Sequence, residues 1–407
     1  MLDLNWSPER VRRNFRIDVF GGISGGAYMG VVVTFMPVVV VRMGGTPFDV
    51  ALVVAAPFIG HLLSPLSAYL LRRLNPVRVV AATSTLARLV FLAVVLLAAT
   101  PQQFAAASIA FWVIAIANIA AYTQLMAGIY PAQERAQAMS KVRMGFGITV
   151  VAAAAAAGTV IDVVPASYVF AAATCLSLPG AIAIFWMRYD PPEDAGAVRR
   201  PAGEMVRDVW ADRRFRLLLT SFTVFGLGNL MNSAVYPILL VEHFDASNTF
   251  VGIMAAVQSA TMIGALLFWG RRIDRGSSLR LTLHNTILLL IVPIGYVLAP
   301  STWALLPVAL VSGIVVAGAD LTYHTNVVQL APKGRVPEYA AAQSFLLGVR
   351  GSVAPFLAAM LLGVIEPRGV LLVGLGAMAA GTAVMARAVR EPKPAPAPQS
   401  TEVSATA

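Results

Sequence analysis

The chain has 407 residues, of which 58% are hydrophobic and 12% are charged, and its mean hydropathy is +0.75. Soluble proteins carry about 25% charged residues, so this composition excludes a soluble globular protein. The formal charge of +10 does not indicate nucleic-acid binding, because the basic residues lie in short polar segments between apolar ones rather than on one soluble domain.

Twelve apolar segments follow one another along the chain. A hydrocarbon core about 30 Å thick needs about 20 helical residues. The segments are continuous, without the alternation of apolar and polar residues that a membrane β-strand shows. They cover residues 17–41, 49–71, 79–100, 103–129, 144–161, 166–187, 217–241, 249–270, 281–300, 303–331, 343–365 and 369–386. We therefore predict an all-α integral membrane protein with twelve transmembrane helices.

The two halves of the chain resemble each other. Residues 122–131 begin with Tyr and end with Pro, and so do residues 323–332, an offset of 201 residues. Pro37 and Pro237 occupy corresponding places in the first and seventh segments. Duplicated halves in a hydrophobic chain are typical of transporters whose halves rock about a central site. The pattern predicts two pseudo-symmetric six-helix bundles.

Polar segments divide the chain into four parts. We assign residues 1–189 to the N-terminal bundle, 190–213 to a cytoplasmic linker, 214–390 to the C-terminal bundle and 391–407 to a tail. Residues 204–216 are predicted to form a short amphipathic helix at the membrane surface. The tail is rich in Pro and poor in large apolar residues, so we expect it to be disordered.

The basic residues indicate the orientation in the membrane. If the N-terminus is cytoplasmic, 26 of the 30 Lys and Arg residues lie on the cytoplasmic side. This asymmetry follows the positive-inside rule and predicts that both termini are cytoplasmic. The single cysteine, Cys175, excludes an intrachain disulfide and a metal site built from several cysteines.

One carboxylate lies deep in the tenth apolar segment. Asp320 is 12 residues before Pro332 and 17 residues after Trp303. A carboxylate at that depth needs water, a partner or a proton. His324 is one helical turn further on and projects from the same face. We interpret Asp320 and His324 as a proton-coupling pair, with hydrogen bonding to each other and to neighbouring helices as the structural alternative.

Residues 270–276, Gly-Arg-Arg-Ile-Asp-Arg-Gly, follow the eighth segment at a predicted cytoplasmic turn. With its Gly-x-x-x-Asp-Arg spacing and twelve segments, the chain resembles bacterial-type members of the major facilitator superfamily. The resemblance implies a latch between the bundles that includes Gly270, Asp274 and Arg275. A solvated turn is the alternative. The corresponding loop in the first half keeps Arg72 but lacks the Gly and the Asp. Arg350, in the eleventh segment, is expected to make a gate or latch contact.

The resemblance also implies which helices line the central cavity, namely the first, fourth, seventh and tenth. Polar residues in the middle of these segments are therefore expected to face the substrate, although polar contacts between helices explain several of them equally well. These residues are Tyr28, Asn118, Tyr122, Asn229, Asn232, Tyr236 and Tyr323. They are mostly neutral, which suggests an uncharged, zwitterionic or singly cationic small molecule.

We therefore expect a monomeric secondary transporter in a bacterial cytoplasmic (inner) membrane, moving a small organic solute by alternating access. A proton or the substrate gradient would drive it, because the sequence has no ATP-binding loop. Its partners would be the solute, the lipid bilayer and, if coupled, protons. A drug/proton antiporter is one alternative, although the fifth segment after Gly147 lacks the Gly-Pro-x-x-Gly-Gly run of that group. A sensor or assembly protein with this fold is another. No enzyme, metal or cofactor motif is present in the sequence, and none of these is expected.

Overall fold

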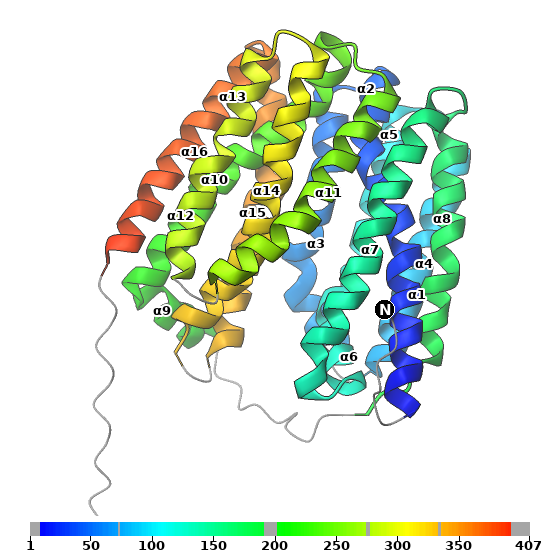
Figure 1. The fold of residues 1–407 in the computed structure, drawn as a ribbon, viewed down its shortest axis with the longest axis vertical. Coiled ribbons are helices and arrows are strands. Elements are labelled where there is room, and N and C mark those ends of the chain that lie inside the picture. The colour runs from blue at the N-terminus through cyan, green and yellow to red at the C-terminus, as the bar shows by residue number, and fades with distance from the viewer. Residues whose placement is uncertain (1–8, 72–73, 191–201, 274–276, 333–334, 392–407) are drawn as a thin grey trace, which may run out of the picture.

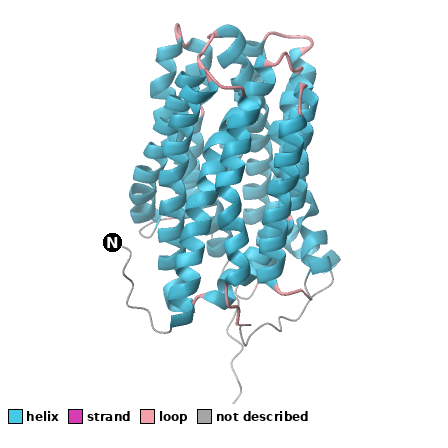
Figure 2. Cartoon of the chain, turned by 90° about the vertical axis from the view of Figure 1, so that its right-hand side faces the viewer, coloured by secondary structure: helices cyan, strands magenta, loops and turns pink. Residues whose placement is uncertain are grey.

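The structure, a computed structural model, describes residues 9–71, 74–190, 202–273, 277–332 and 335–391. Every regular element in these ranges is a helix, and the long helices run side by side (Figure 2). Residues 392–407, the greater part of the predicted disordered tail, and residues 191–201 of the linker lie outside the described ranges.

The first half of the chain contains eight α-helices. They are α1 (Glu9–Tyr28), α2 (Thr34–Arg42), α3 (Pro47–Leu71), α4 (Pro76–Leu97), α5 (Pro101–Ala115), α6 (Ala117–Ile129), α7 (Ala132–Ile161) and α8 (Ala166–Ala183). The sequence explains where two of these helices begin. The side chain of Asn75 caps α4, and Thr100 forms a capping box with Gln103 at the start of α5.

The linker and the second half contain the other eight. They are α9 (Ala202–Ala211), α10 (Arg213–Ile238), α11 (Asn248–Ile273), α12 (Ser278–Leu289), α13 (Ile291–Leu298), α14 (Leu306–Leu330), α15 (Val336–Leu362) and α16 (Pro367–Arg390). The amphipathic helix predicted over residues 204–216 is therefore two helices. Asp212 ends the first and caps the second, because its carboxylate accepts a hydrogen bond from the backbone N–H of Phe215 at 3.0 Å.

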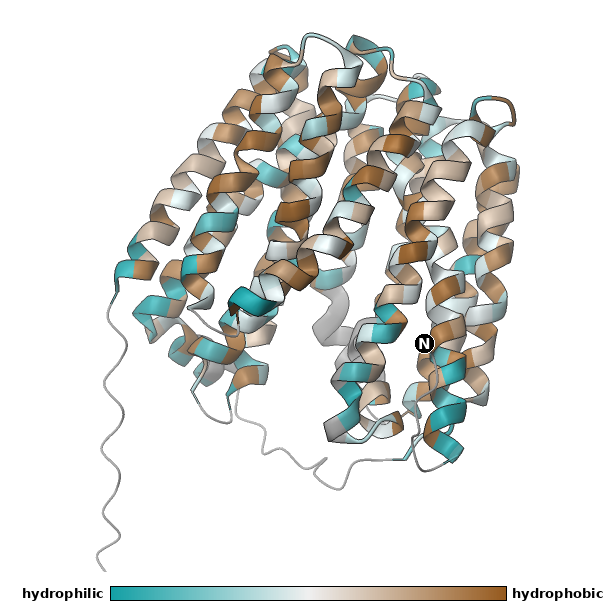
Figure 3. Ribbon diagram, viewed as in Figure 1, coloured by the Kyte–Doolittle hydropathy of each residue, from teal (hydrophilic) through white to brown (hydrophobic). Residues whose placement is uncertain are grey.

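Ten helical segments of the described chain are long and apolar enough to cross a membrane. Two of the twelve predicted spans are not among them. α3 is a continuous helix of 25 residues over the predicted span at 49–71, but its side chains after Leu62 lie outside the described residues, so only Pro47–Leu62 is counted. The predicted span over residues 103–129 is broken at Ile116 into α5 and α6. Hydrophilic residues gather toward the helix ends and hydrophobic residues cover the middle (Figure 3), as lipid on the outside requires.

The first and seventh predicted spans share a local distortion. A π-helical turn, Met29–Val33, precedes Pro37, and another, Leu239–His243, follows Pro237. Proline has no N–H for the helical ladder, so the helix adjusts its hydrogen bonding nearby. Both halves therefore carry a π-helical turn near the corresponding proline, but on opposite sides of it.

Two pairs of helices join the bundles: α3 packs against α15, and α7 packs against α11 (Figure 1). The α7–α11 contact is close because two glycines meet. A Cβ atom on Gly252 would lie 2.6 Å from the carbonyl oxygen of Ala154, and one on Gly158 would lie 2.6 Å from that of Asn248. We call this end of the molecule, at the top of Figure 1, the closed end. At the opposite end, the start of α1 lies beside the last residues of the first bundle, and Arg10 pairs with Asp190 at 2.7 Å. We call this the terminal end.

The glycine crossing gives a test with an internal control on one helix. Gly252→Ala should destabilise the protein by about 1–3 kcal/mol, because the new methyl group meets backbone that cannot move aside. Gly264→Ala, also on α11, has no atom within 4 Å of its new Cβ, and should stabilise the protein by up to about 1 kcal/mol through helix propensity. Thermal unfolding in detergent measures both. Equal effects of the two substitutions would contradict the close crossing.

Candidate functional site

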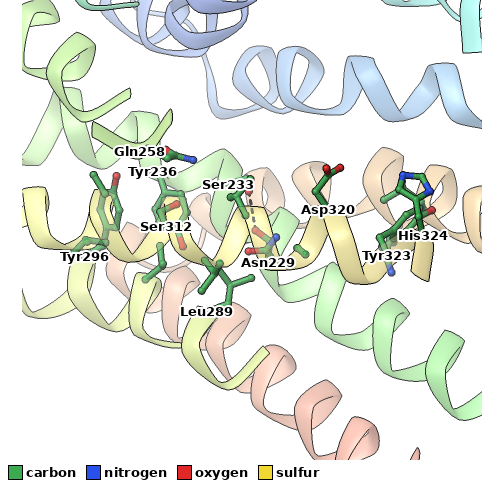
Figure 4. A pocket seen from close by; sticks show the side chains of 18 of the residues that line it. Asn229, Ser233, Tyr236, Gln258, Leu289, Tyr296, Ser312, Asp320, Tyr323 and His324 are labelled. Carbon is green, nitrogen blue, oxygen red and sulfur yellow. Dashed lines mark hydrogen bonds between the residues drawn. The ribbon is translucent and has the colours of Figure 1, made fainter. Parts of the chain in front are cut away.

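A cavity of about 700 Å³ lies in the second bundle and opens toward the first. Its walls come from α10, α11, α12, α13, α14 and α15, and His61 of α3 reaches it from the other bundle. A volume of this size is typical of sites for small organic molecules. Figure 4 shows side chains from several of these helices converging on it.

The wall is mixed in character. Its apolar part includes Leu289, Val292, Val308, Val315 and Leu347. Its polar part consists of His61, Asn229, Ser233, Tyr236, Gln258, Ser312, Asp320, Tyr323, His324, Ser344 and Arg350. An apolar wall with a few convergent polar groups can bind a small molecule and orient it at the same time.

Asp320 and His324 project from α14 on the same side (Figure 4). The carboxylate of Asp320 lies 3.6 Å from the guanidinium of Arg143, which belongs to α7 in the other bundle. Asp320 lies ten residues before the end of α14 and Arg143 eleven residues after the start of α7, so both are about 15 Å from the terminal end. Sequence reasoning missed Arg143 because no local pattern links residues on two bundles.

Two tyrosine hydroxyls in the wall find no hydrogen-bond partner among the residues that the structure describes. The side-chain oxygens of Tyr236 and Tyr323 are buried and without a hydrogen bond among the described residues. The ring of Tyr236 stacks on that of Tyr296, with centroids 4.3 Å apart and an interplanar angle of 25°. A buried hydroxyl without a partner is unfavourable, so a bound molecule that meets it gains binding free energy.

Three of the seven expected substrate-facing residues line this cavity: Asn229, Tyr236 and Tyr323. Asn232 does not, although it lies on the same helix. It is fully buried, and its amide nitrogen is 3.6 Å from the sulfur of Met378 on α16. Three residues turn a helix by about 300°, so Asn232 lies about 60° from Asn229 around α10, on the side that packs against α16.

The three expected residues of the first bundle also lie away from the cavity. Tyr28 is 2% exposed and stacks on Phe111 at 4.4 Å, inside an aromatic cluster. Asn118 donates a hydrogen bond to the hydroxyl of Ser84 at 2.8 Å and so joins α6 to α4. The sequence could not distinguish these packing roles from substrate contact, because both place polar atoms at mid-span depth.

Tyr122 interacts instead with a buried carboxylate that the sequence did not single out. Asp18 of α1 is 6% exposed and accepts a hydrogen bond from the hydroxyl of Tyr130 at 2.9 Å. Tyr122 approaches the same carboxylate. Helix α1 directs this carboxylate into the interior of the first bundle.

The predicted cytoplasmic latch is only partly within the described chain. Asp274, Arg275 and Arg72 lie outside the described residues. Gly270 is near the end of α11, with no atom within 4 Å of a Cβ placed on it. Arg350, expected to make a gate or latch contact, lies in the wall of the cavity, where its side chain reaches α10.

At the closed end, the structure shows a different latch. Asp162, just after α7, accepts four hydrogen bonds from the start of α11: from the backbone N–H groups of Asn248 and Thr249 at 3.1 and 3.0 Å, and from their side chains at 2.9 and 2.6 Å. Arg42 donates to the side-chain oxygen of Asn248 at 3.0 Å. A carboxylate of one bundle thus caps a helix of the other, where the helix dipole favours a negative charge.

The capping also changes the acidity of Asp162. Burial raises the pKa of its carboxyl, but the bonds from Thr249 and Asn248 outweigh burial and hold the pKa below its ordinary value. Because the pKa is lowered in the capped state, the stabilisation is present at neutral pH. It is lost as the pH falls through the lowered pKa.

Membrane-spanning helices in two bundles, with a cavity in one bundle that opens toward the other, are typical of a multi-pass membrane transporter. The sequence matches the Major Facilitator Superfamily over residues 19–231 and 217–406. The chain belongs to this family and is a transporter rather than an enzyme.

Solved structures share the fold. The nucleoside transporter NupG is 11% identical with a TM-score of 0.65, covering 95% of this chain and 100% of that one. A bacterial homolog of the human lysosomal transporter Spinster, in an inward-facing and occupied conformation, is 14% identical with a TM-score of 0.67, covering 95% and 98%. No curated protein matches the sequence. At these identities the likeness shows the fold alone.

The closed-end latch is testable by substitution. Asp162→Asn removes the charge from the cap and should cost about 1 kcal/mol, which moves the balance between closed and open forms of this end about fivefold. Spin labels at Val163 and Asp245, one on each bundle, in a Cys175→Ala background report the separation. In the mutant, a larger fraction of molecules should show the longer distance between the labels. The unmutated chain should show the same change when it is acidified. An unchanged distance distribution would contradict the latch.

Proposed function

We propose that this protein is a proton-coupled secondary transporter that moves a small organic solute across the cytoplasmic membrane by alternating access. The observation that carries the proposal is the ion pair between Asp320 and Arg143. It joins the two bundles beside the cavity, on the side away from the closed end. A carboxylate in this place links the protonation of the cavity wall to the relative position of the bundles.

The orientation of the chain supports the direction of access. With 26 of the 30 basic residues on the side of the termini, the terminal end faces the cytoplasm and the closed end faces outward. The conformation is then one in which the cavity communicates with the cytoplasm while Asp162 and the glycine crossing close the outer side.

In this proposal, the charge of Asp320 controls how easily the two bundles separate at the terminal end. When Asp320 is ionised, its attraction to Arg143 holds α14 near α7. When it is protonated, this attraction is lost and the bundles separate more easily at the terminal end. His324, on the same side of α14, is placed to exchange a proton with the cavity. Solute in the cavity and a proton on Asp320 would therefore influence the same movement, which is the requirement for coupling.

Asp320→Asn tests this coupling in proteoliposomes. The amide imitates the protonated carboxyl, so a pH gradient should no longer drive uptake, while exchange of solute at equal pH continues. Arg143→Gln should retain pH-dependent uptake with an altered rate, because it leaves the titrating group in place. The control is Asp49→Asn, a carboxylate bonded to Thr46 and Gln102 at the closed end.

Each outcome has a distinct meaning. If the pH dependence of Asp320→Asn equals that of the unmutated chain, Asp320 has no part in coupling. If the unmutated protein moves no solute from a broad metabolite panel under any gradient, the transport proposal itself is wrong.

A further inference from the structure

One arginine in the cavity wall has no acidic partner. Arg350 of α15 is 9% exposed, and no described carboxylate lies within ion-pair distance of it. Its Nη1 donates to the carbonyl oxygen of Phe222, while its Nε is buried without an acceptor. A charged side chain buried inside the membrane is unfavourable unless its charge is balanced, and such residues commonly mark a substrate path.

Helix α10 is shaped around this arginine. A Cβ on Gly226 would lie 2.6 Å from the Nε of Arg350, so a larger residue at this point would force the arginine side chain to move. The ring of Phe222 lies 5.8 Å from the guanidinium carbon, within the range of a cation–π contact. These contacts hold the guanidinium in place but do not neutralise its charge.

The other charges of the cavity do not balance Arg350 either. Among the described lining residues, Asp320 is the acidic one, and it is paired with Arg143 across the bundles. The two histidines of the wall, His61 and His324, carry no negative charge. With Asp320 ionised and paired, the cavity wall therefore keeps one uncompensated positive charge.

A hydroxyl donor lies beside this charge. The ring of Tyr323 stacks on that of Phe222, with centroids 6.2 Å apart, and Phe222 also contacts Arg350. The Tyr323 hydroxyl is buried without a partner, so it can donate to a ligand oxygen. Elsewhere in the wall, the stacked rings of Tyr236 and Tyr296 offer a flat surface for an apolar or aromatic body.

We propose that the solute is an organic anion whose carboxylate or phosphate group is bound by Arg350 and the Tyr323 hydroxyl, and whose apolar body lies along the apolar wall of the cavity. This inference rests on the proposed function and changes the expectation of a neutral or cationic solute drawn from the sequence. The anion would supply the negative charge that the protein does not provide, and charge-assisted hydrogen bonds to arginine are among the strongest in proteins.

A set of four probes with one ring and different charges tests the proposal. Thermal unfolding of the full-length protein in detergent is measured with phenylacetate, phenyl phosphate, phenylacetamide and phenethylamine at millimolar concentration. Binding to the folded form raises the apparent Tm by mass action. At least one of the two anions should raise the Tm, and the amide and the amine should not. The anion that gives the larger shift identifies a carboxylate or a phosphate site.

Substitutions then assign the effect to Arg350. Arg350→Gln should weaken binding of that anion at least about tenfold, as expected when a charged hydrogen-bonding partner is removed. Arg350→Lys keeps the charge without the guanidinium geometry and should retain part of the shift. The matched control is Arg88→Lys. Arg88 is also buried, but it bonds to Ser177 and Ser84 inside the first bundle, so its substitution should leave the anion shift unchanged.

Three results would overturn the proposal: stabilisation by the amide or the amine equal to that by the anions, no stabilisation by either anion, or a full anion shift in Arg350→Gln. The unmutated protein alone decides the first two, so a variant that fails to fold does not prevent the test. If a neutral or cationic solute shows proton-driven flux that depends on Asp320, this inference is wrong and the proposed function stands.

Discussion

The contact between α7 and α11 is the interaction on which the rest of the structure depends. Two glycines bring the backbones of the bundles together, and Asp162 of one bundle caps a helix of the other. The bundles are thereby joined at one end, so their inner faces enclose space rather than closing on each other or meeting lipid. The opening of the cavity toward the first bundle and the Asp320–Arg143 pair both depend on that geometry.

The charges near the cavity fall into two kinds. The Asp320–Arg143 pair crosses between the bundles, so its strength changes when the bundles move. Arg350 is held by α10 and α15 of the same bundle, through the carbonyl of Phe222 and the space left by Gly226. The first arrangement suits a switch and the second suits a fixed binding site. Placing a variable charge and a fixed charge in one wall allows a proton and an anion to influence the same movement.

Much of the fold could be predicted from the sequence. The length of the apolar segments indicated membrane helices, and the matching prolines indicated two related halves. The family match confirms this fold. The residues of the candidate site were harder to predict than the fold. Asn229, Tyr236, Asp320, Tyr323 and His324 do lie on the cavity. Tyr28 and Asn232 are also a tyrosine and an asparagine at mid-span depth, yet their side chains pack inside a bundle. Which neighbours a side chain meets depends on helices that are far away in the sequence.

The sequence by itself determined that this chain lies in a membrane as helices, because only the helix satisfies all backbone polar groups of a long apolar segment in lipid. It also determined that one carboxylate lies at depth in the tenth segment. Only the tertiary structure decided which charges meet. Arg143 is 177 residues from Asp320, and no carboxylate in the described part of the chain pairs with Arg350. Electrostatic interaction depends on distance in space and on burial rather than on separation along the chain.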